Sequence, residues 1–193
     1  MKPNWHLLNF ALALTAAAVV ARTAAAQSTT AQSTTSHATF VSASEINAAV
    51  AKSNTGPFSD SPLRVVPIEG KYNVGVAVVR RTKVGGRVLP DALIHDDVTE
   101  VYQILAGEGV LVTGGALKSA TPLTASAVVA EIGPGSAGQS IVGGTSHHIV
   151  PGDIVVIPPH TPHGFVNISA PRIVYAVIRI DPQQVLELRS KPE

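Results

Sequence analysis

From residue 63 onward, the chain is a series of short apolar or alternating runs separated by turns rich in glycine and proline. β-branched and aromatic residues dominate these runs, which is typical of strands with at least one face in a core. One run, Ile154–Ile157, is apolar throughout and is expected to be buried on both faces. Many short strands joined by tight turns favour an all-β sandwich or barrel. The predicted strands are Arg64–Ile68, Tyr72–Arg81, Val98–Leu105, Val110–Thr113, Ala127–Ile132, His147–Val150, Ile154–Ile157 and Ile173–Ile180.

The first 41 residues do not show this pattern. Leu7–Ala21 is almost entirely apolar, and Ala24–Ala26 supplies an A-x-A cleavage site, which together predict a signal peptide over residues 1–26. A retained N-terminal anchor is the alternative. The sequence AQSTT occurs twice between residues 26 and 35, and so polar a segment predicts a low-complexity linker over residues 27–41. The mature protein is therefore expected in the periplasm or secreted.

A short amphipathic helix is predicted after the linker, over Ala43–Ser53. Ser42 and Glu45 have the spacing of a capping box, which marks the start of a helix. The apolar face is formed by Ile46, Ala49 and Val50.

Turn residues predict the remaining boundaries of the chain. Glycine and proline residues after the helix indicate a loop, so that residues 42–62 form a short helix and loop ahead of the barrel. The barrel domain is expected over residues 63–182. Residues 183–193 are expected to form a C-terminal tail, and Pro182–Leu188 is predicted as a short helix.

Composition and charge narrow the function classes. Cleavage after Ala26 removes Lys2 and Arg22 but no acid, so the formal charge changes from +1 to −1. This balance gives no electrostatic footprint for nucleic acid, and no membrane partner is expected after cleavage. The chain has no cysteine, so an exported protein of this kind is stabilised by its core.

One candidate stretch for chemistry lies between residues 93 and 107. Alternate residues of a strand share a face, so Leu93 and His95 are expected to point the same way. If that face is the barrel interior, His95 and Glu100 are ionisable groups in an apolar cavity. Such groups are costly there unless they are paired or bind a metal.

The other candidate stretch is Gly152–Asn167, which contains His160 and His163. Three prolines between residues 158 and 162 rule out a regular ladder or helix. A rigid turn around two imidazoles suits a binding site. The alternative is a proline-rich turn with solvated histidines.

These two stretches resemble the two motifs of the cupin family. The family's first motif reads G-x5-H-x-H-x3-4-E-x6-G, and His95, Glu100 and Gly107 fall on its second histidine, its glutamate and its last glycine. The second motif reads G-x5-P-x-G-x2-H-x3-N, and every spacing is intact. Its matching residues are Gly152, Pro158, His163 and Asn167. The resemblance implies a cupin-type double-stranded β-helix, a jelly-roll barrel that is often dimeric.

The resemblance also implies a metal near one end of the barrel interior. His95, Glu100 and His163 are the expected ligands of one divalent ion, which could be Fe, Mn, Zn or Ni. A His–Glu ion pair or hydrogen bond without metal is the alternative. The pocket beside this site is expected to include Leu93, Tyr102, Ile104, His160, Phe165 and Asn167.

The chain departs from the cupin pattern at two positions. Leu93 stands where the family has its first histidine, so one of the four usual ligands is missing. An alternative register makes Asp97 the second histidine position, but it leaves only two residues before Glu100. His160 replaces the glycine of the second motif and would adopt a left-handed conformation at some cost.

Three function classes remain open. The first is a small-molecule binding protein with a metal in its pocket, assembled as a homodimer by family resemblance. The second is a metal-dependent enzyme of the oxygenase, isomerase or decarboxylase type, between which fold does not choose. The third is a metal-free structural or interaction barrel. Residues 116–146 contain only one predicted strand and are expected to cover one end of the barrel or to form a surface loop.

Overall fold

The computed structural model describes residues 37–52, 56–83 and 92–190. The expected signal peptide and residues 27–36 of the linker lie outside the described residues. The elements are α1 (Ala43–Lys52), β1 (Phe58–Ile68), β2 (Tyr72–Thr82), β3 (Ala92–His95), β4 (Thr99–Ala106), β5 (Gly109–Thr113), β6 (Ala116–Lys118), β7 (Thr121–Pro122), α2 (Ser126–Ile132), β8 (Gly135–Gly138), β9 (Ser140–Val142), β10 (Thr145–Ile149), β11 (Ile154–Ile157), β12 (His163–Ile168) and β13 (Arg172–Asp181).

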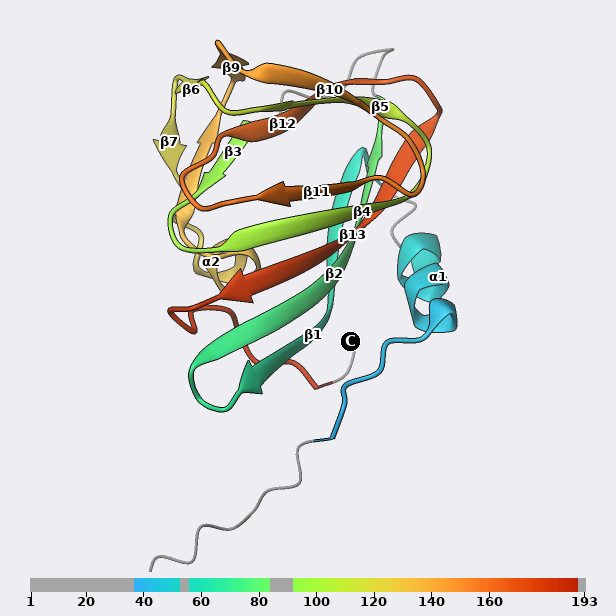
Figure 1. Ribbon diagram of the computed structural model, residues 1–193, viewed down its shortest axis with the longest axis vertical. Coiled ribbons are helices and arrows are strands. Elements are labelled where there is room, and N and C mark those ends of the chain that lie inside the picture. The colour runs from blue at the N-terminus through green and yellow to red at the C-terminus, as the bar shows by residue number, and fades with distance from the viewer. Residues whose placement is uncertain (1–36, 53–55, 84–91, 191–193) are drawn as a thin grey trace, which may run out of the picture. The chain divides into compact units, whose positions relative to one another are not determined.

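Two antiparallel sheets face each other and form the body of the fold (Figure 1). The five-stranded sheet has the order β1-β2-β13-β4-β11, and the six-stranded sheet has the order β10-β5-β12-β3-β8-β7. From β3 to β5, and again from β10 to β13, successive strands alternate between the sheets. This alternation is the arrangement of a double-stranded β-helix, and the predicted jelly-roll fold is confirmed.

The main core lies between the two sheets and is built by strand alternation. Ala77 and Val79 of β2 face inward, while Val78 between them faces outward. Tyr102, Ile104, Phe165 and Tyr175 add the large side chains of this core, all of them buried. The site described below occupies one part of the same interior.

Helix α1 packs against the outer face of the five-stranded sheet. Its partly buried side chains Ile46, Ala49 and Val50 contact a cluster formed by Leu63, Val78 and Val174. The predicted capping box is present: the Ser42 amide donates to Glu45 Oε2 at 2.9 Å, and the Glu45 amide donates to Ser42 Oγ at 3.2 Å. The predicted helix is therefore confirmed, with its end at Lys52.

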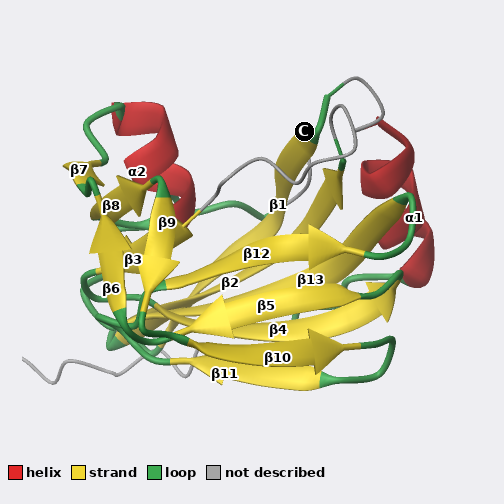
Figure 2. Ribbon diagram, turned by 90° about the horizontal axis from the view of Figure 1, so that it is seen from above, coloured by secondary structure: helices red, strands yellow, loops and turns green. Residues whose placement is uncertain are grey.

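Helix α2 was not predicted. The segment Ala127–Ile132 has the β-branched composition of a strand, but it forms a helix that ends at Gly133, which has φ 85°. Val128 and Ile132 are one helical turn apart and both line the pocket described below. Tertiary contact on one face thus overrides the β propensity of the segment. In Figures 1 and 2, α1 and α2 lie at opposite ends of the barrel.

Four other expectations about secondary structure were wrong. β1 begins at Phe58, so the expected loop before residue 63 is shorter and Pro62 lies within the strand beside a register shift. In β11, Ile154 and Val156 alternate with the inward-facing Val155 and Ile157 and are more than 60% exposed instead of buried. Pro182–Leu188 is not helical; the Asp181 carboxylate there accepts the amides of residues 185 and 186. Residues 116–146 hold α2 and four short strands instead of a single strand.

Across the described residues, no helix combines the length and the apolar character that crossing a membrane requires.

Candidate metal centre

The first motif places His95 and Glu100 on opposite sheets. His95 is the last residue of β3 in the six-stranded sheet, and Glu100 is near the start of β4 in the five-stranded sheet. Only a short turn separates the strands, so the two side chains meet where the sheets converge. Gly107 closes the motif with φ 77°, and a Cβ there would overlap the carbonyl of Arg172, which explains the requirement for glycine.

The second motif brings His163 to the same point. His163 is the first residue of β12, and it pairs with Leu93 across the ladder. The proline-rich turn before it is tied to β3, because the His160 amide donates to the His95 carbonyl at 2.8 Å. His160 itself has φ 59°, the left-handed conformation expected for the position of the motif glycine.

The side chains of His95, Glu100 and His163 converge in a buried group. His95 Nε2 lies 3.4 Å from Glu100 Oε2, and His163 Nε2 lies 3.2 Å from the same oxygen. The imidazole rings are stacked, with their centroids 5.4 Å apart. All three residues are at most 3% exposed, and their ligand atoms lie within 4.8 Å of one another.

Three of the four imidazole nitrogens in this group have no hydrogen-bond partner: both of His95 and Nε2 of His163. His163 Nδ1 lies 3.0 Å from the Thr161 carbonyl, which can only accept, so Nδ1 carries a proton and donates. In the neutral ring Nε2 then presents a lone pair toward Glu100, whose carboxylate also cannot donate. Buried polar atoms without partners are costly, and a shared cation would give a partner to His163 Nε2 and to one nitrogen of His95. The donor set therefore fits a divalent metal.

The electrostatics of the site keep Glu100 ionised. Burial alone raises the pKa of a carboxyl, but the charge of the Arg179 guanidinium opposes it as the largest lowering influence, and the pKa of Glu100 lies well below its ordinary value of 4.5. Arg179 Nε donates to Glu100 Oε1 at 2.9 Å. Tyr102 donates its hydroxyl to Glu100 Oε2 at 2.9 Å, and burial together with the Glu100 charge raises the pKa of this phenol well above 10. Tyr102 is thus a protonated donor.

Arg179 connects the site to β1. Its guanidinium binds both carboxylate oxygens of Asp60, and it also donates to the carbonyl of Glu131 in α2 at 3.4 Å. Arg179 thereby fixes the face of Glu100 that points away from the imidazoles. This leaves Glu100 Oε2 directed at His95 and His163.

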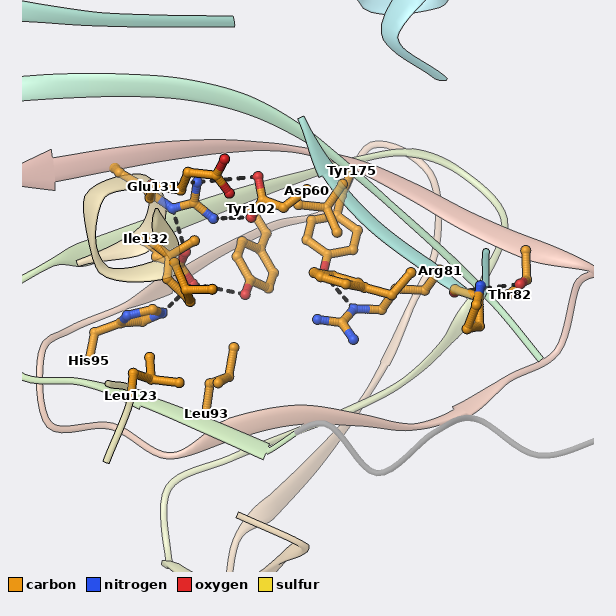
Figure 3. A pocket seen from close by; sticks show the side chains of 16 residues that line it. Asp60, Arg81, Thr82, Leu93, His95, Tyr102, Leu123, Glu131, Ile132 and Tyr175 are labelled. Carbon is orange, nitrogen blue, oxygen red and sulfur yellow. Dashed lines mark hydrogen bonds and ion pairs between the residues drawn. The ribbon is translucent and has the colours of Figure 1, made fainter. Parts of the chain in front are cut away.

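A pocket of about 340 Å³ opens beside the group. Figure 3 shows His95, Tyr102 and Leu93 around one part of it, with Arg81 and Tyr175 farther along. Helix α2 contributes Val128, Glu131 and Ile132 to the lining. Residues 116–146, which were expected either to cover one end of the barrel or to form a surface loop, therefore supply part of the pocket wall. The volume is in the range of small-molecule sites.

Four residues expected in the pocket lie elsewhere in the described structure. Ile104 and Phe165 are buried in the main core and are not part of the pocket lining. His160 and Asn167 are exposed. Leu93 and Tyr102 line the pocket as expected. Asp97, the alternative ligand, is not part of the metal-binding group found among the described residues. This favours the register in which His95 occupies the second histidine position of the motif.

The sequence reasoning missed Arg81 and Arg179, both buried in the site region. A signal was present, because each interrupts an otherwise apolar strand sequence, VAVVRR in β2 and VYAVIRI in β13. A charge in such a run is expected to be paired or functional. Asp60 was assigned to a loop and therefore was not considered.

Comparisons with known proteins agree with this architecture. A family model described as an AraC-like ligand binding domain matches residues 137–192, which is less than half of the chain. A search of curated proteins found no match.

Several solved structures are similar to this chain at low sequence identity. A cupin protein from Bacteroides fragilis is 16% identical, with coverage of 61% of this chain and 74% of that chain and a TM-score of 0.36. A conserved protein with a double-stranded β-helix domain from Klebsiella pneumoniae is 20% identical, with coverages of 76% and 91% and a TM-score of 0.41. A protein from Bacillus halodurans is 13% identical, with coverages of 75% and 83% and a TM-score of 0.45.

The chain thus contains a cupin-like double-stranded β-helix domain. Its strand topology and the two motifs carry this conclusion. The buried group of His95, Glu100 and His163 can bind a metal, and the pocket beside it has the size for a small molecule.

Proposed function

We propose that the protein is an exported binding protein that holds one divalent metal through His95, Glu100 and His163 and takes a small molecule in the adjoining pocket. The observation that carries this proposal is the convergence of three ligand side chains with imidazole nitrogens that have no partner. Two imidazoles and one carboxylate are a usual ligand set for Fe, Mn, Zn or Ni. Three protein ligands leave open coordination positions for the small molecule.

The protein's own residues prepare this site. Tyr102 and Arg179 donate to different oxygens of Glu100 and so fix the carboxylate plane. The Thr161 carbonyl fixes the tautomer of His163 with the lone pair of Nε2 facing the group. A divalent ion held there would supply positive charge that orients or polarises a bound ligand.

Export is supported by the sequence of residues 1–26, with its apolar run and A-x-A site. The mature protein is expected to begin at Gln27 and to lie in the periplasm or outside the cell. Mass spectrometry of the protein from its native host tests this, and a terminus at Met1 would contradict it.

A homodimer is expected from the resemblance to cupins. The edge strand β11 supports it, because Ile154 and Val156 present exposed apolar side chains, 64% and 62% accessible, at the end of the five-stranded sheet. Light scattering coupled to size exclusion measures the mass, and a monomer would remove this expectation.

Metal-dependent catalysis is the second candidate function. It is favoured by the open positions of a three-ligand site and by the protonated Tyr102 hydroxyl directed at Glu100 Oε2. Fold alone does not choose among oxygenase, isomerase and decarboxylase reactions. The third class is a metal-free interaction barrel. Measuring the metal content of the purified protein distinguishes it from the binding protein and from the enzyme.

The decisive experiment is a metal titration of the mature protein. Purified protein is stripped with a chelator and titrated with Zn²⁺, Mn²⁺ and Fe²⁺ by calorimetry, with elemental analysis of the untreated sample. One ion per chain is expected. His163→Ala should weaken binding at least about 100-fold, because loss of a ligand should exceed the effect of losing an outer partner.

His147→Ala is the matched control. His147 is exposed and hydrogen-bonded to the Thr113 hydroxyl at 3.0 Å, away from the buried group. It should bind metal as the unaltered protein does. Equal loss in both variants would place the metal elsewhere, and no metal binding by any form would leave the metal-free barrel as the function class.

A further inference from the structure

Besides the metal group, the pocket contains a second chemical feature, the Arg81 guanidinium. Arg81 comes from β2, is only 7% exposed, and lines the same pocket as His95 and Glu100. In Figure 3 its guanidinium points toward the space bordered by Leu93 and Tyr102. A buried cation at the wall of a small-molecule pocket bears directly on which ligands the pocket accepts.

The position of this cation is fixed from several sides. Arg81 Nε donates to the Tyr175 hydroxyl at 2.8 Å, and its guanidinium lies 4.5 Å from the centroid of the Phe58 ring and 5.7 Å from that of Phe165. Arg81 has other interactions as well. A guanidinium carries five N–H donors, so one arginine side chain can bond several acceptors at once.

The acidic side chains nearby are largely committed to other partners. Asp60 lines the pocket, but both of its carboxylate oxygens are bonded to Arg179. Glu100 is held by Arg179 and Tyr102. Glu131 also lines the pocket, and burial together with Asp60 raises its pKa. The cation best placed to attract an anionic ligand is therefore Arg81.

The rest of the lining limits the body of the ligand. Apolar and aromatic side chains dominate it, and the volume of about 340 Å³ is at the low end for small-molecule sites. The apolar and aromatic lining residues include Leu93, Tyr102, Leu123, Val128, Ile132 and Tyr175. Such walls suit a small hydrocarbon or aromatic body with few polar groups.

We propose that the ligand of this pocket is a small organic acid whose carboxylate is bound by Arg81 and whose apolar body extends toward the metal group. This inference rests on the proposed function for the identity of the pocket as the ligand site. Arginine binds carboxylates through paired N–H donors in a fixed plane. The aromatic rings and the Tyr175 hydroxyl hold that plane in place before the ligand arrives.

The test compares each acid with its neutral amide by calorimetry. Phenylacetate is measured against phenylacetamide, and hexanoate against hexanamide, on both metal-free and Zn²⁺-loaded protein. The acid should bind at least about tenfold more tightly than its amide, the difference expected from a hydrogen bond to a charged group. Arg81→Gln should abolish this preference, and Arg172→Gln should keep it, because Arg172 is exposed and outside the described pocket lining.

The outcomes separate this inference from the metal site. An acid preference that depends on Arg81 in protein without metal affinity would support the inference and refute the metal. Metal binding with equal affinity for acid and amide would refute the inference alone. A preference that survives in Arg81→Gln and appears only with Zn²⁺ would place the carboxylate on the metal and overturn the assignment to Arg81. The comparison on unaltered protein needs no variant, so it stands even if Arg81→Gln fails to fold.

Discussion

Replacement of Arg179 by methionine is the most informative single perturbation of this fold. Arg179 is 4% exposed and is bonded to two carboxylates, Glu100 and Asp60, which are buried or nearly so. Arg179→Met keeps most of the side-chain volume but leaves both carboxylates without their cation. Removing one partner of a buried ion pair costs about 3–5 kcal/mol, because an uncompensated charge remains buried.

The expected loss can be measured as a melting temperature. A domain of this size loses roughly 2–4 °C per kcal/mol, so Arg179→Met should melt about 6–20 °C lower than the unaltered protein. Circular dichroism in the presence of a chelator gives the value without a contribution from metal. Arg172→Met removes an exposed arginine of the same strand and should change stability by no more than about 0.5 kcal/mol.

A pH series and a double variant show whether the buried charge is the cause. Without Arg179, burial dominates at Glu100 and raises its pKa, so Arg179→Met should be less destabilised at pH 5 than at pH 7.5. Combining it with Glu100→Gln should cost less than the sum of the single changes, by roughly 0.5–3 kcal/mol. A loss below about 1 kcal/mol at pH 7.5, or strict additivity, would refute the reasoning.

Three further predictions follow from named contacts. Leu93→His should tighten metal binding in a calorimetric titration, because Leu93 is the direct ladder partner of His163 and lines the pocket; unchanged affinity would show that the added imidazole does not reach the group. Ser42→Ala should lower stability by about 1 kcal/mol by removing half of the capping box, measured by urea unfolding, whereas an unchanged midpoint would mean that α1 does not depend on this cap. The pKa of Glu100 is lower in the folded protein than its ordinary value of 4.5, so the ionised carboxylate contributes its full stabilisation above pH 4.5 and loses it as the pH falls. The free energy of unfolding should therefore decline below about pH 4.5, and Glu100→Gln should flatten that decline.

Local chemistry in the sequence determined much of the fold. The β-branched composition of the runs and the turn residues between them were sufficient to predict β2, β4, β5, β10 and β13. The capping box gave the start of α1, since its hydrogen bonds join residues only three apart. The motif spacings predicted His95, Glu100 and His163 as the ligands of one site, although these residues lie on three strands in two sheets.

The tertiary structure decided what depends on neighbours distant in the chain. α2 is a helix because Val128 and Ile132 meet the pocket wall, a contact that strand propensity does not contain. β11 is exposed on one face because only Val155 and Ile157 face the core, while Ile154 and Val156 face outward, which its uniformly apolar sequence does not show. Arg81 and Arg179 become part of the site only when β2 and β13 lie beside each other in the five-stranded sheet. Pairing of charges across such distances is set by the fold, so the sequence could mark these arginines as unusual but could not assign their partners.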